Sequence, residues 1–150
     1  MSRIYFAYGS NMHLAQMARR CPNSPLKGAG VLRGYRWIIT SRGYANIVPD
    51  PQEMVEGLLF LLSAEDEIKL DHFEGVAQGN YRKAAVTVRS NGEALIALAY
   101  IDPIVAEGRP QDEYVARMNM AVRDAQLSPE YLQQTIRRFI PEGSRGEPEG

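Results

Sequence analysis

The sequence contains few of the residues that mark several common classes of protein. Its one cysteine, Cys21, excludes an internal disulfide framework and fits a reducing compartment. Its 17 lysines and arginines offset 18 aspartates and glutamates, which leaves a net charge of -1. The composition therefore gives no electrostatic reason to bind nucleic acid or an anionic membrane surface.

Long apolar runs are also missing from the sequence. No segment approaches the roughly 18 apolar residues that a membrane-spanning helix needs. The apolar run that follows Arg3 is short and is broken by Gly9, so we expect no signal peptide. These absences predict a cytoplasmic protein.

Signals for metals and cofactors are weak. His13, His72 and Cys21 are too few and too widely separated to predict a zinc site, and Cys21 has no obvious histidine partner for a catalytic thiol. Residues 28–34 resemble a loose dinucleotide fingerprint, but the pattern predicts no strand before them and no helix after them. We therefore expect neither a metal nor a cofactor.

The chain does have the composition of a globular domain. It has 150 residues, of which 45% are hydrophobic and 23% charged. One compact domain over residues 1–140 accounts for the apolar pattern. Residues 141–150 include no apolar residue to bury, so a disordered tail is expected there.

Strand patterns outnumber helix patterns and do not alternate with them. Strands are predicted over residues 4–8, 27–41, 45–48, 55–62, 84–89 and 93–101. Helices are predicted over residues 12–20, 64–71, 111–125 and 129–139. Ser63 and Ser128 are expected N-caps, and Asn91-Gly92 is a hairpin signal. The fold class is therefore α+β, with a mixed or antiparallel sheet that can close into a small β-barrel with flanking helices.

The segment FAYGSNM, residues 6–12, is the first stretch that indicates chemistry. A run of strand-forming residues stops there at Gly9, and Ser10 and Asn11 are turn formers. A glycine allows another group to approach the backbone closely. Such a loop is suited to bind a small anion, and the alternative is an ordinary turn.

The segment LDHFEGV, residues 70–76, is the second stretch that indicates chemistry. Glu74 follows a predicted helix and has apolar neighbours in Phe73 and Val76. Desolvation by these neighbours would raise the pKa of the glutamate and make it a better proton acceptor and donor near neutral pH. The alternative is a helix-terminal glutamate that faces water.

Together with GYRWIITSRGYANIVPD and GNYRK, these two segments resemble the gamma-glutamylcyclotransferases, over roughly residues 3–140. The resemblance implies a small mixed β-barrel with flanking helices. It also implies a cofactor-free enzyme that converts the glutamyl part of a γ-glutamyl amide or dipeptide to 5-oxoproline and releases the amine. The expected partner is a small γ-glutamyl substrate, with no nucleic acid and no membrane, and a homodimer is left open.

The resemblance also assigns roles to residues. The substrate loop falls on five consecutive positions: Tyr8, Gly9, Ser10, Asn11 and Met12. The catalytic glutamate falls on Glu74, and the site tyrosines fall on Tyr81 and Tyr114. Backbone N–H groups of the loop are expected to bind either the developing oxyanion or the α-carboxylate. The amine side of the pocket is expected to involve residues 77–80 and 103–110.

Two other functions remain open on the same fold. Some related proteins remove a γ-glutamyl group from a biosynthetic intermediate and share the core motif. A non-catalytic protein that binds a small molecule is the other alternative. The sequence does not identify the physiological substrate.

Overall fold

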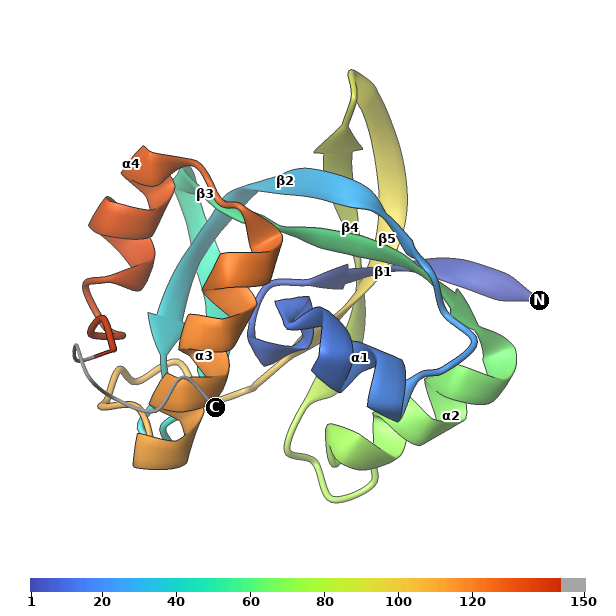
Figure 1. Cartoon of the computed structure of the whole chain (residues 1–150), viewed down its shortest axis with the longest axis horizontal. Coiled ribbons are helices and arrows are strands. Elements are labelled where there is room, and N and C mark those ends of the chain that lie inside the picture. The colour runs from blue at the N-terminus through green and yellow to red at the C-terminus, as the bar shows by residue number, and fades with distance from the viewer. Residues whose placement is uncertain (144–150) are drawn as a thin grey trace.

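The computed structural model describes residues 1–143 as a small closed β-barrel flanked by helices (Figure 1). The strands are β1 (Ser2–Ala7), β2 (Leu26–Ile39), β3 (Ala45–Ser63), β4 (Arg82–Ser90) and β5 (Glu93–Ile101). They follow the order β1-β3-β2-β4-β5, and a parallel contact between β1 and β5 closes the ring. The other strand pairs are antiparallel. The predicted α+β barrel is therefore confirmed.

The helices lie on two sides of the barrel. A 3₁₀ turn, η1 (Ser10–Met12), leads into α1 (Leu14–Arg20), and α1 lies beside α2 (Ala64–Phe73) in Figure 1. On the other side α3 (Asp112–Ala125) is followed by α4 (Pro129–Tyr131) and a π-helical segment, η2 (Leu132–Ile136). In the described part of the chain, none of these helices has the length and apolar character needed to cross a bilayer.

Local capping and turn signals are confirmed. The Ser63 hydroxyl accepts a hydrogen bond from the Asp66 backbone N–H at 3.1 Å and caps α2. Asn91 and Gly92 both have positive φ, 51° and 82°, as a two-residue type I′ hairpin turn requires. The Ser128 hydroxyl similarly caps α4.

Some predicted boundaries are wrong. The predicted strands 45–48 and 55–62 form one strand, β3, although prolines were expected to separate them. Pro49 pairs with Tyr35, and the next paired residue of β3 is Met54, opposite Arg33. The residues between, including Pro51, therefore bulge out of the ladder, where a missing N–H donor does no harm.

Helix ends also differ from the prediction. The predicted helix 12–20 starts only at Leu14, after the 3₁₀ turn, and the predicted helix 129–139 divides after Tyr131. A disordered tail was expected over residues 141–150. Residues 144–150 lie outside the described part of the chain, so this expectation stays a prediction.

The barrel interior and the space beneath the helices form one apolar core. Its largest fully buried side chains include those of Phe6, Trp37, Leu59, Leu98 and Met118. β1 is exposed at its start and buried at its end, so it carries the chain from the surface into this core. The loop that follows β1 therefore starts from a fixed point at the end of the barrel.

Two paired glycines provide a test of how tightly β1 packs. Gly30 and Gly57 are register partners. A Cβ on Gly57 would overlap the Ala7 carbonyl oxygen and lie 2.8 Å from the Phe6 ring. A Cβ on Gly30 would instead lie 2.5 Å from a methyl group of the buried, β-branched Val88, so the contact there is with a side chain and not with backbone.

We expect Gly57→Ala to lower the free energy of unfolding by about 2 to 3 kcal/mol, because backbone and a buried ring cannot move aside. Gly30→Ala, the comparison variant, should lower it by less, about 1 to 2 kcal/mol, because a side chain can adjust where backbone cannot. Urea unfolding of both variants measures the difference. Equal losses would contradict the tighter packing of Gly57 against Ala7 and Phe6.

Candidate active site

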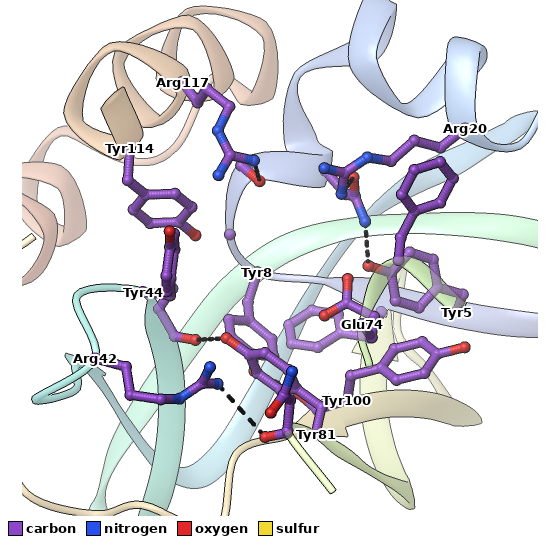
Figure 2. A pocket seen from close by; sticks show the side chains of 17 residues that line it. Tyr5, Tyr8, Arg20, Arg42, Tyr44, Glu74, Tyr81, Tyr100, Tyr114 and Arg117 are labelled. Carbon is purple, nitrogen blue, oxygen red and sulfur yellow. Dashed lines mark hydrogen bonds between the residues drawn. The ribbon is translucent and has the colours of Figure 1, made fainter. Parts of the chain in front are cut away.

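A cavity of about 300 Å³ opens at the end of the barrel, where β1 runs into the glycine loop (Figure 2). Its walls come from segments that are far apart in the sequence. The lining residues are Tyr5, Phe6, Tyr8, Gly9, Ser10, Asn11, Arg20, Arg42, Tyr44, Ala45, Phe73, Glu74, Asn80, Tyr81, Tyr100, Tyr114 and Arg117. The wall is thus rich in tyrosine and arginine, with a single carboxylate.

Seven of the eight predicted site residues line this cavity: Tyr8, Gly9, Ser10, Asn11, Glu74, Tyr81 and Tyr114. Met12 does not. Its side chain is fully buried in the core, and its backbone N–H donates to the Gly9 carbonyl at 3.0 Å. The η1 turn therefore points Met12 inward and uses its N–H group.

A tight turn brings Glu74 to the cavity. Glu74 is the residue after α2, and its N–H still donates to the Leu70 carbonyl at 2.9 Å. Gly75 then reverses the chain with φ 66°, and a Cβ there would lie 2.5 Å from the side-chain nitrogen of Asn80. Only glycine suits this position, and the turn also delivers Tyr81 to the same cavity.

The Glu74 carboxyl is partly buried and points into the cavity beside Tyr5 (Figure 2). Burial raises its pKa to about 7, while Arg20, Arg117 and Arg42 act in the opposite direction. Within residues 1–143 no hydrogen bond or ion pair engages its oxygens. Glu74 can therefore take up or release a proton near neutral pH.

Phe73 contributes to the site in another way than expected. The sequence predicted that it would shield Glu74, yet its side chain is 53% exposed. The Arg20 guanidinium carbon lies 4.8 Å from the centre of its ring. The apolar environment of Glu74 therefore comes from the cavity wall as a whole.

The tyrosines of the wall are held in place by hydrogen bonds. The Tyr81 hydroxyl donates to the Ala45 carbonyl at 2.9 Å, and the Tyr100 hydroxyl donates to Asp71 Oδ1 at 2.6 Å. Burial raises the pKa of Tyr81 and Tyr100 well above the usual range and that of Tyr114 to about 12. These hydroxyls therefore stay protonated at neutral pH.

The polar side chains of the glycine loop fix its shape. The Asn11 amide donates to the Tyr5 hydroxyl at 3.0 Å, and its oxygen accepts from Gln16 at 2.9 Å and from Arg20 at 3.2 Å. The buried Gln16 also donates to the Ser10 hydroxyl at 3.0 Å. Gln16 belongs to α1, and no sequence motif had singled it out.

Gly9 is needed for space. Its φ of −124° lies outside the left-handed region that favours glycine. A Cβ at this position, however, would lie 2.9 Å from the Tyr114 hydroxyl oxygen and 3.3 Å from the Ala45 Cβ. The glycine therefore lets α3 place Tyr114 directly against the loop.

Three arginines of the wall were not predicted. Arg20 lies at the end of α1, Arg42 in the turn between β2 and β3, and Arg117 on α3. They are far apart in the sequence, so they form no local pattern. The only available signal was that an anionic ligand needs positively charged residues around it. Of the segments expected on the amine side, residues 77–80 contribute Asn80 and residues 103–110 contribute nothing to the wall.

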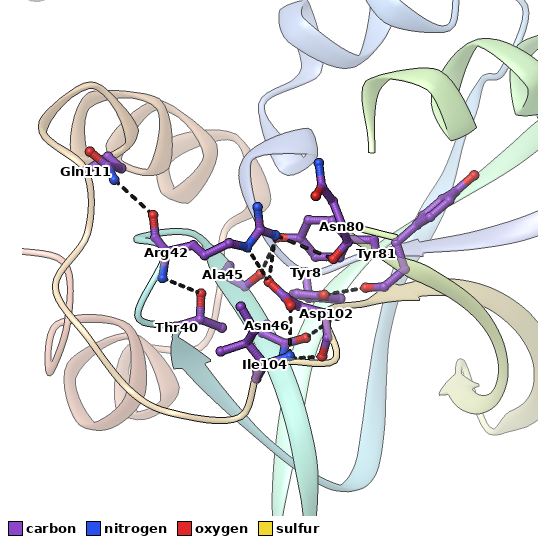
Figure 3. Close-up of polar contacts among 11 residues, drawn as sticks. Tyr8, Thr40, Arg42, Ala45, Asn46, Asn80, Tyr81, Asp102, Ile104 and Gln111 are labelled. Atoms are coloured by element: carbon purple, nitrogen blue, oxygen red, sulfur yellow. Dashed lines mark hydrogen bonds and ion pairs between the residues drawn. The ribbon is translucent and has the colours of Figure 1, made fainter. Parts of the chain in front are cut away.

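Residues 103–110 belong to a segment that supports the wall from behind (Figure 3). Arg42 Nη2 lies 2.7 Å from Oδ2 of the buried Asp102, whose N–H donates to Asn46 Oδ1 at 2.8 Å. The Asn46 side chain donates in turn to the Ile104 carbonyl at 2.9 Å. The Gln111 side chain donates to the Arg42 carbonyl at 2.9 Å. This network fixes the direction of the Arg42 guanidinium.

Among the residues that the structure describes, the cavity wall includes no cysteine that could act as a nucleophile. Cys21 is buried outside the cavity lining, and its burial raises the pKa of its thiol to about 11. Across residues 1–143, no group of three or more His, Cys, Asp and Glu side chains is placed to hold a metal ion.

Fold and site together define a small-barrel protein with a cationic, tyrosine-rich pocket around one titrating carboxyl. The chain belongs to the family described as gamma-glutamyl cyclotransferase, AIG2-like, whose model matches residues 5–117. The resemblance drawn from the sequence motifs is thereby confirmed.

Solved structures share the fold. One is a gamma-glutamyl cyclotransferase, 22% identical with a TM-score of 0.84, covering 100% of this chain and 94% of that one. Another is the uncharacterized protein loc79017 from Homo sapiens, 22% identical with a TM-score of 0.83, over 99% and 94% of the two chains. YkqA from Bacillus subtilis is 27% identical with a TM-score of 0.79, over 95% of this chain and 56% of YkqA. No curated protein matches this chain.

The raised pKa of Glu74 predicts how stability changes with pH. Between pH 4.5 and 7 the folded protein binds the Glu74 proton more tightly than the unfolded chain does, so folding is favoured at low pH. As the pH rises through this window, wild type should lose about 2 kcal/mol relative to Glu74→Gln, which cannot ionise. This free energy is smaller than the one equivalent to the full pKa shift, because the carboxyl is partly exposed and solvent screens it.

Urea unfolding of both proteins at several pH values checks this. The difference in unfolding free energy should change between pH 4.5 and 7 and become constant above that window. A difference that does not vary with pH would show that the folded site leaves the titration of Glu74 unchanged.

Proposed function

We propose that the protein is an enzyme that cyclises the glutamyl part of a γ-glutamyl amide or dipeptide to 5-oxoproline and releases the amine or amino acid. The observation that carries this proposal is Glu74. It presents a carboxyl that no described residue pairs with, with a pKa of about 7, to the same cavity as the Gly9–Asn11 loop. Membership of the gamma-glutamyl cyclotransferase, AIG2-like family supports it.

The reaction needs no nucleophile from the protein. The α-amine of a γ-glutamyl amide can reach its own γ-carbonyl carbon and close a five-membered ring. The pocket has to hold the amine and the carbonyl at attack distance, which contributes about 7 to 11 kcal/mol in the best intramolecular cases. A rigid wall of hydrogen-bonded tyrosines suits that task.

Proton transfer is the role proposed for Glu74. The α-ammonium must lose one proton before attack and a second as the ring nitrogen becomes an amide, and the leaving nitrogen takes up two. The C–N bond to the leaving amine breaks as that nitrogen is protonated. Because the pKa of Glu74 is about 7, both its forms are populated at neutral pH, and one carboxyl can carry these protons in turn.

Charge on oxygen also has to be stabilised. The developing oxyanion needs hydrogen-bond donors in place before the reaction. The Met12 N–H is already bonded to Gly9, so any contribution of the loop backbone comes from residues before Met12. Arg42 and Arg117 line the cavity and can donate hydrogen bonds to the anionic group of a glutamyl substrate.

Replacing Glu74 tests the proposal directly. Glu74→Gln keeps the size of the side chain but removes its ability to accept a proton. We expect turnover of a γ-glutamyl dipeptide, followed as 5-oxoproline by mass spectrometry, to fall by about 10² to 10⁴. Substrate binding, measured by calorimetry, should largely persist.

Glu65→Gln is a matched control, because Glu65 is exposed on α2 and does not line the cavity. Its turnover should stay within about twofold of wild type. A folded Glu74→Gln variant with near-wild-type turnover would remove Glu74 from the mechanism. A wild type that binds γ-glutamyl compounds and releases no 5-oxoproline would instead favour the non-catalytic binding protein.

Cys21 tests whether the attack is intramolecular. Its buried thiol, with a pKa of about 11, lies outside the cavity lining, so Cys21→Ser should keep turnover within about twofold of wild type. Mass spectrometry of the enzyme during turnover should show no glutamyl adduct. An acyl-enzyme on Cys21 would contradict the scheme.

A further inference from the structure

Arg20 differs from the other two arginines of the cavity in its charge balance. Arg42 lies 2.7 Å from the Asp102 carboxylate, and Arg117 lies 2.9 Å from that of Glu113. Within residues 1–143 Arg20 forms no ion pair with any carboxylate. Its positive charge is therefore available to a ligand.

The contacts of Arg20 hold its guanidinium in place without using most of its donors. One N–H group donates to the Asn11 side-chain oxygen at 3.2 Å, and the guanidinium lies 4.8 Å from the centre of the Phe73 ring. A guanidinium has five N–H donors in a planar fork. The remaining donors match the geometry of a carboxylate.

Arg20 and Phe73 lie at the open side of the cavity. Phe73 is 53% exposed and Arg20 is partly exposed, whereas Tyr8 and Tyr100, which also line the cavity, are buried. In Figure 2 Arg20 lies across the cavity from Tyr81, on the same side as Glu74. If the glutamyl group binds deep among the tyrosines, the leaving amine faces the open side of the cavity, where Arg20 and Phe73 lie.

Glu74 lies on the same side of the cavity as Arg20, so the proposed proton transfer takes place near the open side (Figure 2). Under the proposed function, the leaving nitrogen must come within hydrogen-bond distance of the Glu74 carboxyl to receive its proton. Of the three arginines, Arg20 exerts the largest electrostatic effect on Glu74. If the leaving group is an α-amino acid, its carboxylate carbon is two bonds from that nitrogen, on the side of the cavity that Glu74 and Arg20 share in Figure 2.

We propose that Arg20, braced by Phe73 and Asn11, binds the carboxylate of the leaving amino acid and makes γ-glutamyl-α-amino acids the preferred substrates over γ-glutamyl derivatives of simple amines. This inference rests on the proposed function and adds a determinant of specificity to it. The Phe73 ring offers an apolar surface to the side chain of the same amino acid.

Two substrates that differ only in this carboxylate test the inference. γ-Glutamylalanine and γ-glutamylethylamide share all other heavy atoms. We expect wild type to have a kcat/KM about 10- to 100-fold higher for γ-glutamylalanine, the usual worth of a hydrogen bond to a charged group. Arg20→Gln should lose this preference, so that its ratio of kcat/KM for γ-glutamylalanine to that for γ-glutamylethylamide falls to about 1. The ratio is the readout, because the loss of the Arg20 charge also acts on Glu74 and changes turnover of both substrates.

Two further variants separate charge from structure. Arg19→Gln removes the same charge from the neighbouring residue of α1, which is exposed and outside the cavity lining, and it should keep the full preference. Arg20→Lys keeps the charge but not the planar fork, so it should keep part of the preference. Thermal melts check that each variant is folded.

Each outcome has a distinct meaning. If Arg20→Gln slows both substrates equally, Arg20 binds the glutamyl α-carboxylate or only supports the loop, and the inference is overturned while the proposed function stands. Equal kcat/KM of wild type for the two substrates also overturns it. If wild type releases 5-oxoproline from neither substrate, the proposed function fails, and the inference fails with it.

Discussion

The antiparallel pairing of β1 with β3 is the constraint on which the site depends. It runs from Ser2 opposite Ser63 to Ala7 opposite Leu58, so the two strands end at opposite ends of the barrel. β1 delivers the glycine loop at one end, and β3 starts α2 at the other. The six residues of β1 span about 17 Å and the ten residues of α2 span about 15 Å. The helix therefore runs back along the strand, and its last turn brings Glu74 to the loop.

The charges around Glu74 are balanced within this frame. Three arginines line one cavity with a single carboxylate, yet the pKa of Glu74 is raised, because its burial outweighs their attraction. Asp102 and Glu113 offset the charges of Arg42 and Arg117, which weakens the effect of these arginines on Glu74. The ion pairs of the wall thus help to keep the carboxyl near the pKa at which it can exchange protons. This effect connects residues as distant as Asp102 with the chemistry proposed for Glu74.

Features that depend on neighbouring residues could be predicted from the sequence, and features that depend on barrel closure could not. The Ser63 cap and the Asn91-Gly92 turn are local, and the glutamate after α2 was recognised from its immediate neighbours. The continuity of β3 through its prolines depends on a bulge opposite β2, which no local pattern encodes. Arg20, Arg42 and Arg117 line one cavity only because the barrel brings three distant segments together. A short sequence motif cannot encode such an arrangement.

The shape of the glycine loop is explained largely by contacts within the protein. A side chain on Gly9 would collide with the Tyr114 hydroxyl, and the side chains of Ser10 and Asn11 are engaged by Gln16. A protein that merely kept the fold would need the same loop. The carboxyl of Glu74 has no such structural reason. Its burial costs stability, no hydrogen bond or ion pair within residues 1–143 engages it, and the attraction of the three arginines offsets that cost only in part. Glu74 is therefore stronger evidence for catalysis than the loop that first suggested a binding site.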